Sequence, residues 1–302
     1  MSVLAVLIFA GLAGMTRAQE IAMSEIKFNK GQSIQPAFEG WMKNSDGSFS
    51  LWFGYLNRNY EETPDIPIGP NNGFGAGGED LGQPTHFLSR RQPWVFKVTV
   101  PADWPKDKDV VWTVTANGTT LKAYGSLWPV WEIDPLDTAT RPGRDYGDPD
   151  NAPPKITSPP IPDQTVAVGT PLTLTLSVTD DGLPKPANRG GGGRGGRGGP
   201  GGGAAASADL GPATATASVD ADVPQIRGGL RVEWIQYRGV GKVKFSPSPA
   251  PVLDAAGKPD LTGGTATTKV TFDKPGVYTL RAVATDGQGS MNIRDLKVTV
   301  TN

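Results

Sequence analysis

The sequence contains no cysteine and only one histidine, His86. The lack of cysteine excludes disulfides, thiolate metal sites and thiol catalysis, so the folded state has to be stabilised by packing. Any Ser-His-Asp triad or histidine-based metal site has to use His86. Charge of one sign is also lacking, because 29 Lys and Arg nearly balance 30 Asp and Glu. This balance argues against a global attraction to nucleic acid or to an anionic membrane.

Long apolar runs are missing as well. The longest, residues 3–14, is too short to span a bilayer. It is followed by Thr16-Arg17-Ala18, a small-x-small pattern typical of signal peptidase cleavage. We therefore predict a secretory signal peptide over residues 1–18 and an exported protein, either periplasmic or extracellular. One irregularity is that no Lys or Arg precedes the run. The alternative interpretation is a buried N-terminal strand or helix.

Glycine and proline, in contrast, are abundant, with 40 and 28 residues in a chain of 302. Such a composition favours many short strands and turns over long helices, and the length suits two domains. We predict an all-β protein with two β-sandwich domains, at residues 19–134 and 155–302. Residues 135–154, which are polar and rich in proline, are expected to form a semi-rigid linker between them.

Alternating apolar residues mark the strands of the first domain. In residues 48–56 the alternation places Phe49, Leu51, Phe53 and Tyr55 on one face and Trp52 on the other. The alternation in residues 94–100 likewise predicts one face made of Trp94, Phe96, Val98 and Val100. Asn117-Gly118 lies between two further strand patterns and predicts a tight hairpin.

Between these strands, residues 61–91 are too long for a plain turn, which makes the segment a candidate functional loop. It contains His86 and five carboxylates: Glu61, Glu62, Asp65, Glu79 and Asp80. Paired carboxylates near a histidine are compatible with a hydrolase. No established catalytic spacing connects these groups, and a lone histidine beside an aromatic residue is more often a structural hydrogen-bond donor.

In the second domain, residues 272–287 predict a strand with one buried face that starts after a Pro-Gly corner. Tyr278 follows that corner two positions before Leu280, as the tyrosine corner does in immunoglobulin-like (Ig-like) sandwiches. Trp234 lies in a second alternating strand and is expected in the same core. Residues 182–229 contain almost no bulky apolar side chains and include the Gly-rich run 189–203, so we predict a disordered insertion.

The segments SVTDDGLPKP (177–186), RVEWIQYRGVGKVKFSP (231–247) and TTKVTFDKPGVYTLRAVATDG (267–287) occur in this order before a last strand at 295–301. Together they resemble the polycystic-kidney-disease-repeat-like (PKD-like) Ig modules of bacterial extracellular proteins. The resemblance covers about residues 153–302 apart from the insertion, which the family pattern lacks. It implies an Ig-like fold and a role as a spacer or as an adhesion or ligand-presenting unit.

Tryptophan is concentrated in the first domain, which contains seven of the eight: Trp41, Trp52, Trp94, Trp104, Trp112, Trp128 and Trp131. Core packing accounts for those in regular alternation. Four others break the alternation or flank Pro and Gly, and we predict that they line an open groove that binds a ligand. These four are Trp41, Trp52, Trp104 and Trp128.

Two weaker signals concern ions and nucleic acid. Asp180-Asp181-Gly182, Asp286-Gly287 and residues 148–151 have oxygen ligands suited to Ca²⁺, although none matches a complete calcium loop and Asp-Gly also simply ends strands. We therefore predict no required cofactor, with Ca²⁺ as the open alternative. The Arg-Gly run has three arginines and no interleaved aromatics, which favours a solvated loop over a nucleic-acid-binding segment.

From the sequence we predict a secreted, non-catalytic binding or structural protein. Its first domain is expected to bind an extracellular glycan or protein, while the Ig-like domain acts as a spacer or adhesion unit. The alternative is an exported hydrolase with its site in the 61–91 loop. The sequence gives no indication of the oligomeric state and predicts no membrane span.

Overall fold

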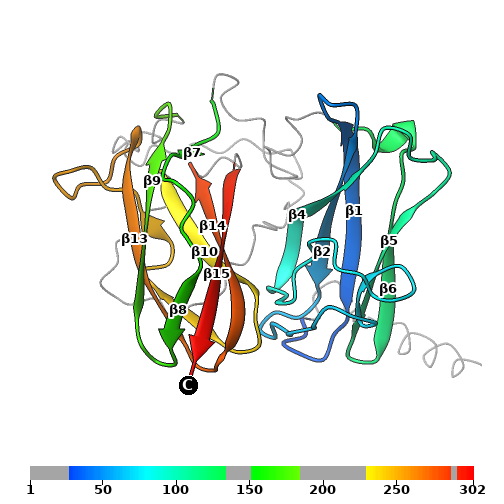
Figure 1. The fold of residues 1–302 in the computed structure, drawn as a ribbon, viewed down its shortest axis with the longest axis horizontal. Helices are drawn as coiled ribbons and strands as arrows, with labels where there is room; N and C mark the ends of the chain where they lie inside the picture. Colours follow the sequence, from blue (N-terminus) through cyan, green and yellow to red (C-terminus); the bar gives the residue numbers. More distant parts are fainter. Residues whose placement is uncertain (1–26, 134–150, 184–228, 287–290) are drawn as a thin grey trace, which may run out of the picture.

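The computed structural model describes residues 27–133, 151–183, 229–286 and 291–302. The predicted signal peptide, most of the predicted linker and nearly all of the Gly-rich insertion lie outside these ranges. The described chain is all-β, as predicted, and forms two β-sandwiches side by side (Figure 1). Among the described residues, no helix is long and apolar enough to cross a membrane.

The first sandwich packs two three-stranded antiparallel sheets against each other. One sheet has the order β1-β2-β4 and the other β3-β5-β6. The strands are β1 (Ile34–Lys43), β2 (Phe49–Asn57), β3 (Asn72–Phe74), β4 (Arg90–Val100), β5 (Val110–Ala116) and β6 (Thr119–Gly125). Leu51, Phe53 and Tyr55 of β2 face the core as the alternation predicts, and Trp112 of β5 is fully buried among them.

The hairpin between β5 and β6 forms at Asn117-Gly118, as predicted. Ala116 pairs with Thr119, so the loop has two residues. Asn117 and Gly118 both have positive φ angles, 49° and 76°, which a type I′ turn requires and which these two residue types adopt most readily.

The second sandwich contains a five-stranded sheet, β12-β10-β14-β15-β8, and a four-stranded sheet, β11-β13-β9-β7. Its strands are β7 (Lys155–Ile156), β8 (Gln164–Ala167), β9 (Leu172–Thr179), β10 (Arg231–Arg238), β11 (Val243–Ser246), β12 (Ala250–Pro251), β13 (Gly263–Phe272), β14 (Gly276–Thr285) and β15 (Met291–Thr301). In Ig terms, β7, β9, β13 and β11 occupy the places of strands A, B, E and D, and β10, β14 and β15 those of C, F and G. This strand order defines an Ig-like sandwich.

The tyrosine corner predicted at Tyr278 is present. The Tyr278 side chain is fully buried, and its hydroxyl donates to the Lys274 carbonyl oxygen four residues upstream at 2.8 Å. Trp234 and Leu280 lie in the same core, as expected, with 2% and 0% of their surfaces exposed.

Candidate functional site

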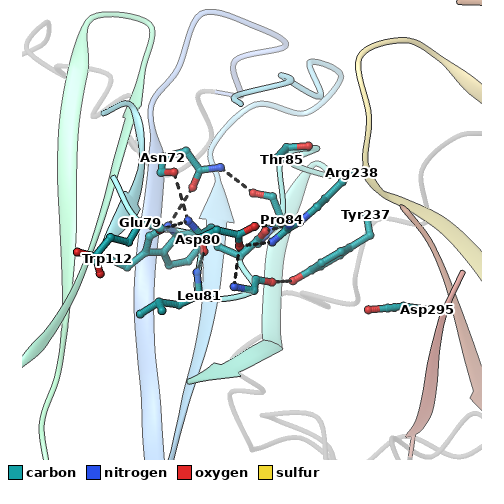
Figure 2. Close-up of polar contacts among 12 residues, drawn as sticks. Asn72, Glu79, Asp80, Leu81, Pro84, Thr85, Trp112, Tyr237, Arg238 and Asp295 are labelled. Carbon is teal, nitrogen blue, oxygen red and sulfur yellow. Dashed lines mark hydrogen bonds and ion pairs between the residues drawn. The ribbon is translucent and has the colours of Figure 1, made fainter. Parts of the chain in front are cut away.

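The long segment between β2 and β4 is held in shape by buried amide side chains. Asn72 and Gln83 have no exposed surface. The Asn72 amide nitrogen donates to the carbonyl oxygen of Ile66. It also donates to the Pro84 carbonyl oxygen, and the Asn72 amide oxygen accepts from the Trp112 indole at 3.0 Å (Figure 2). Because a buried amide is costly to leave unpaired, these bonds fix the loop against the core.

The loop contacts the Ig-like domain. The Tyr237 hydroxyl of β10 donates to the Gly82 carbonyl oxygen at 2.5 Å, and the backbone carbonyl of Tyr237 accepts from the N–H groups of Thr85 and His86, both at 3.2 Å. In Figure 2 the Tyr237 and Arg238 side chains extend from the Ig-like domain towards the loop. The loop predicted as a functional segment therefore joins the two sandwiches.

Arg238 adds an ion pair to this contact. Its guanidinium binds both carboxylate oxygens of Asp80, at 2.9 and 2.8 Å, and its Nε donates to the Gln83 carbonyl oxygen at 2.9 Å. The hydrogen bonds from Arg238 lower the pKa of the Asp80 carboxyl below its ordinary value. Since Asp80 is half-exposed, the pair stabilises the contact less than its geometry alone suggests.

Arg281 of β14 adds a largely buried polar contact between the domains. It is 8% exposed, binds Asp295 through two hydrogen bonds of 2.7 and 2.8 Å, and stacks over the Tyr237 ring at 3.6 Å. Its Nη1 donates to the Val95 carbonyl oxygen of β4 at 2.5 Å. Burial raises the pKa of Tyr237 to about 12, so this phenol stays neutral and able to donate. We call Asp80, Tyr237, Arg238 and Arg281 the interdomain clamp.

His86 lies beside this clamp. Its Nδ1 is 2.7 Å from Asp65 Oδ1, while the backbone N–H of His86 belongs to the domain contact. The other loop carboxylates with described bonds have partners elsewhere: Asp80 binds Arg238, Glu61 accepts from the Asn29 amide, and Glu62 accepts from the Gly31 N–H. The structure therefore brings one carboxylate, not two, to His86.

Of the aspartates considered for Ca²⁺, Asp180, Asp181 and Asp286 lie where residues 151–152 meet the ends of β9 and β14, whereas residues 148–150 are outside the described ranges. The Asn151 amide donates to Asp286 Oδ2 at 2.7 Å, and the Ala152 N–H donates to Asp181 Oδ2 at 2.6 Å. Burial, with the nearby charges of Asp181 and Asp286, raises the pKa of Asp180 to about 6. Within the described ranges, no three His, Cys, Asp or Glu side chains are grouped so that they could hold a metal ion.

The prediction that Trp41 is exposed is wrong. Trp41 is 8% exposed and its ring contacts Phe49 in the core. The irregularity between Phe38 and Gly40 shifts the alternation of β1 by one position, so Trp41 faces inward. Its indole nitrogen donates to the Trp128 carbonyl oxygen at 2.8 Å.

Trp52 and Trp104 are partly buried and each has its own neighbours. Trp52 is on the outer face of β2, where it meets Trp94 edge to face at 6.4 Å. Trp94 is 8% exposed, so its predicted burial is confirmed. Its predicted position on the same face as Phe96 is wrong, because a positive φ of 54° takes it out of the alternation and it packs against Trp52 instead. The Trp104 indole donates to the Lys108 carbonyl oxygen, and the Lys108 ammonium lies 4.3 Å from its ring centroid.

Trp128 is exposed, as predicted, together with a residue that the sequence did not single out. Trp128 is 62% exposed and Trp131 is 45% exposed. Trp131 ends a short 3₁₀ turn, η2 (Pro129–Trp131), and Trp128 is the residue directly before it. The available signal was the spacing itself, because two tryptophans three residues apart with proline between them indicate a 3₁₀ turn. Of the four predicted ligand-binding tryptophans, Trp128 has the most exposed ring.

Comparisons with known proteins give no family. No family model matches the chain, and no curated protein sequence is similar to it. Solved structures that it resembles include the eight N-terminal Ig domains of Down syndrome cell adhesion molecule (8% identity, 89% of this chain and 24% of that chain, TM-score 0.24) and the tandem Ig repeats of Dlar (11%, 89% and 97%, TM-score 0.25). A third is a protein of unknown function from Porphyromonas gingivalis W83 (9%, 88% and 98%, TM-score 0.23). The chain spans about a quarter of the first of these, and the Ig-like assignment rests on strand order rather than on these scores.

Proposed function

We propose that the chain is an exported, non-catalytic binding protein. Its Ig-like domain, which resembles PKD-like spacer modules, holds and orients an aromatic-rich first domain towards an extracellular glycan or protein. The interdomain clamp is the observation that carries this proposal. The 61–91 loop, which contains the candidate catalytic groups, uses its Asp80 carboxylate and the backbone of residues 82–86 to bind the other domain.

A clamp of this kind suits presentation of a binding surface. Interfaces between domains of one chain are often polar and allow relative motion unless several contacts fix them. Here a buried arginine, an ion pair and backbone hydrogen bonds act together at one contact. Two sandwiches held at a fixed angle present their surface in a defined direction, which lowers the entropic cost of binding.

The second candidate is the exported hydrolase, which the contact between His86 and Asp65 favours. A carboxylate that accepts from the histidine Nδ1 orients the ring and supports its action as a base. If the chain is a binding protein, the contact between His86 and Asp65 instead fixes the loop beside the clamp.

The test compares binding and turnover in the full chain. Wild type and His86→Gln, which keeps the backbone contacts to Tyr237, are screened for capture of polysaccharides and surface proteins and for hydrolysis of ester, glycoside and peptide substrates. We expect equal capture by both proteins and no turnover that depends on His86. Hydrolysis that is present in wild type and lost in His86→Gln would establish the hydrolase instead.

A further inference from the structure

The turn formed by Trp128, Pro129, Val130 and Trp131 presents two aromatic rings and one aliphatic side chain to solvent. Trp128, Val130 and Trp131 are 62%, 79% and 45% exposed, which places them among the most exposed large apolar side chains of the described chain. Trp128 immediately precedes the 3₁₀ turn and Trp131 ends it, so at a rise of about 2 Å per residue their backbones are roughly 6 Å apart. We call this surface the tryptophan turn.

Contacts with β1 hold the turn in place. The Trp128 carbonyl oxygen accepts from the Trp131 N–H at 2.9 Å and from the Trp41 indole at 2.8 Å. The Ile133 N–H donates to the Trp41 carbonyl oxygen at 2.9 Å, and the Trp131 ring meets Phe38 edge on at 5.6 Å. Exposed indoles on a fixed backbone lose little entropy when a ligand covers them.

The size of the surface indicates what it can hold. With about 250 Å² for a fully exposed tryptophan, the two indoles present roughly 270 Å². A stable protein interface needs about 800 Å² from each partner, so the turn alone is too small for a protein or for a second copy of the chain. It matches one or two sugar rings, whose C–H faces stack on indoles.

The charge of the segment that contains the turn narrows the range of possible ligands further. Residues 125–133 include no Lys or Arg, and their one charged side chain is Glu132, which is exposed. A carboxylate beside the rings repels uronic acids, sulfated sugars and phosphates. A neutral sugar has no such penalty, and its hydroxyls can donate to the carboxylate.

We propose that Trp128 and Trp131 form a binding site for a neutral glycan, with the two indoles stacking on sugar rings. The inference rests on the proposed binding function and names the residues and the ligand class. Trp41 acts as a positioning residue, since its N–H fixes the carbonyl of Trp128. The other candidate tryptophans, Trp52 and Trp104, contribute to folding rather than to this site.

The experiment uses the full chain on an array of neutral and acidic polysaccharides, followed by calorimetric titration with the oligosaccharides that bind. Trp128→Ala and Trp131→Ala are compared with Tyr124→Ala, a matched control in which an exposed aromatic residue of β6 outside the turn is removed. We expect a neutral glycan to bind wild type at least tenfold more tightly than acidic polymers. Each tryptophan variant should weaken binding at least tenfold, and Tyr124→Ala should leave it unchanged. The melting temperature should stay within about 2 °C in Trp128→Ala, whose side chain is mostly exposed, and fall by a few degrees at most in Trp131→Ala, which also loses its contact with Phe38.

Four results would overturn the inference. If glycan binding survives both tryptophan variants, or if only acidic glycans bind, the site or the ligand class is wrong while the proposed binding function stands. The same holds if wild type captures a protein, or associates with itself, through these tryptophans and binds no sugar. If wild type binds neither glycans nor proteins, the proposed function fails together with the inference.

Discussion

Replacing Arg281 by methionine tests whether the interdomain clamp couples the two sandwiches. Methionine keeps most of the apolar stem but removes the charge-assisted hydrogen bond to the Val95 carbonyl oxygen, worth about 1.5–3 kcal/mol. It also removes the stacking on Tyr237, worth about 1–2 kcal/mol in a desolvated site. The Asp295 carboxylate is 42% exposed, so leaving it unpaired costs less than about 1 kcal/mol. We expect the free energy of unfolding to fall by about 3 kcal/mol.

Urea unfolding of the full chain measures both the loss and the coupling. Seven of the eight tryptophans lie in the first sandwich, so tryptophan fluorescence reports mainly on that domain, whereas far-ultraviolet circular dichroism reports on both. We expect the two curves to coincide in wild type and to separate in Arg281→Met.

The matched control is Lys297→Ala, which breaks an exposed ion pair between Lys297 of β15, the strand next to β14, and Asp163, the residue before β8. Its Nζ–Oδ2 distance is 3.8 Å, and we expect a loss below about 0.5 kcal/mol. A loss below about 1 kcal/mol in Arg281→Met, with the two curves still coincident, would refute the reasoning.

Three further substitutions test the Ig-like domain by thermal and urea unfolding. Trp234→Ala should cost about 3–5 kcal/mol because the side chain is 98% buried in the core, and a loss under 1 kcal/mol would contradict that placement. Tyr278→Phe should cost about 1 kcal/mol by removing the hydroxyl bond to Lys274, and an unchanged stability would show that the corner bond contributes nothing. The third is Asp180→Asn. The pKa of Asp180 is raised to about 6, so the folded state binds more protons than the unfolded state between about pH 4 and 6, and stability falls as the pH rises through that window. Asp180→Asn should therefore stabilise the fold at pH 7, by no more than about 1 kcal/mol because Asp180 is partly exposed, and should have little effect at pH 4; destabilisation at pH 7 would contradict the sign.

The strands were predictable from the sequence because each sandwich has one buried face. A period of two in Tyr278, Leu280 and Ala282 identifies the inward side chains without knowledge of their partners. The hairpin at Asn117-Gly118 was equally accessible, since few residues adopt two consecutive positive φ angles.

The clamp was not predictable by the same means. Arg281 and Tyr237 lie outside the core of their own domain, where they stack on each other and bond to the other sandwich. Contacts of this kind have no periodicity in sequence. The predicted faces of Trp41 and Trp94 were wrong for a related reason. One irregularity in β1 and one in β4 reverse the face on which the residues beyond them lie.

Only one of the two tryptophans of the tryptophan turn was predicted to bind a ligand. Trp128 stood out because proline follows it, whereas Trp131 resembled one more aromatic residue before the linker. Their relation depends on the turn that joins them, which the Trp41 indole holds from another strand.

The two halves of the clamp differ in the chemical groups that they supply. The Ig-like domain supplies donor side chains, those of Tyr237, Arg238 and Arg281. The first domain supplies mainly acceptors of the main chain, the carbonyl oxygens of Gly82, Gln83 and Val95. A carbonyl oxygen is the same for every amino acid, so the Ig-like domain recognises the backbone path of the first domain rather than its side chains at these three positions. Gly82, with a φ of 103°, and the buried Gln83 amide are constrained by the loop itself, whereas Val95 can vary. Sequence variation should therefore be tolerated unequally by the two domains at the interdomain clamp. A foreign sandwich with the same loop path and a carboxylate at the position of Asp80 could replace the first domain, whereas the three donor side chains have no such freedom.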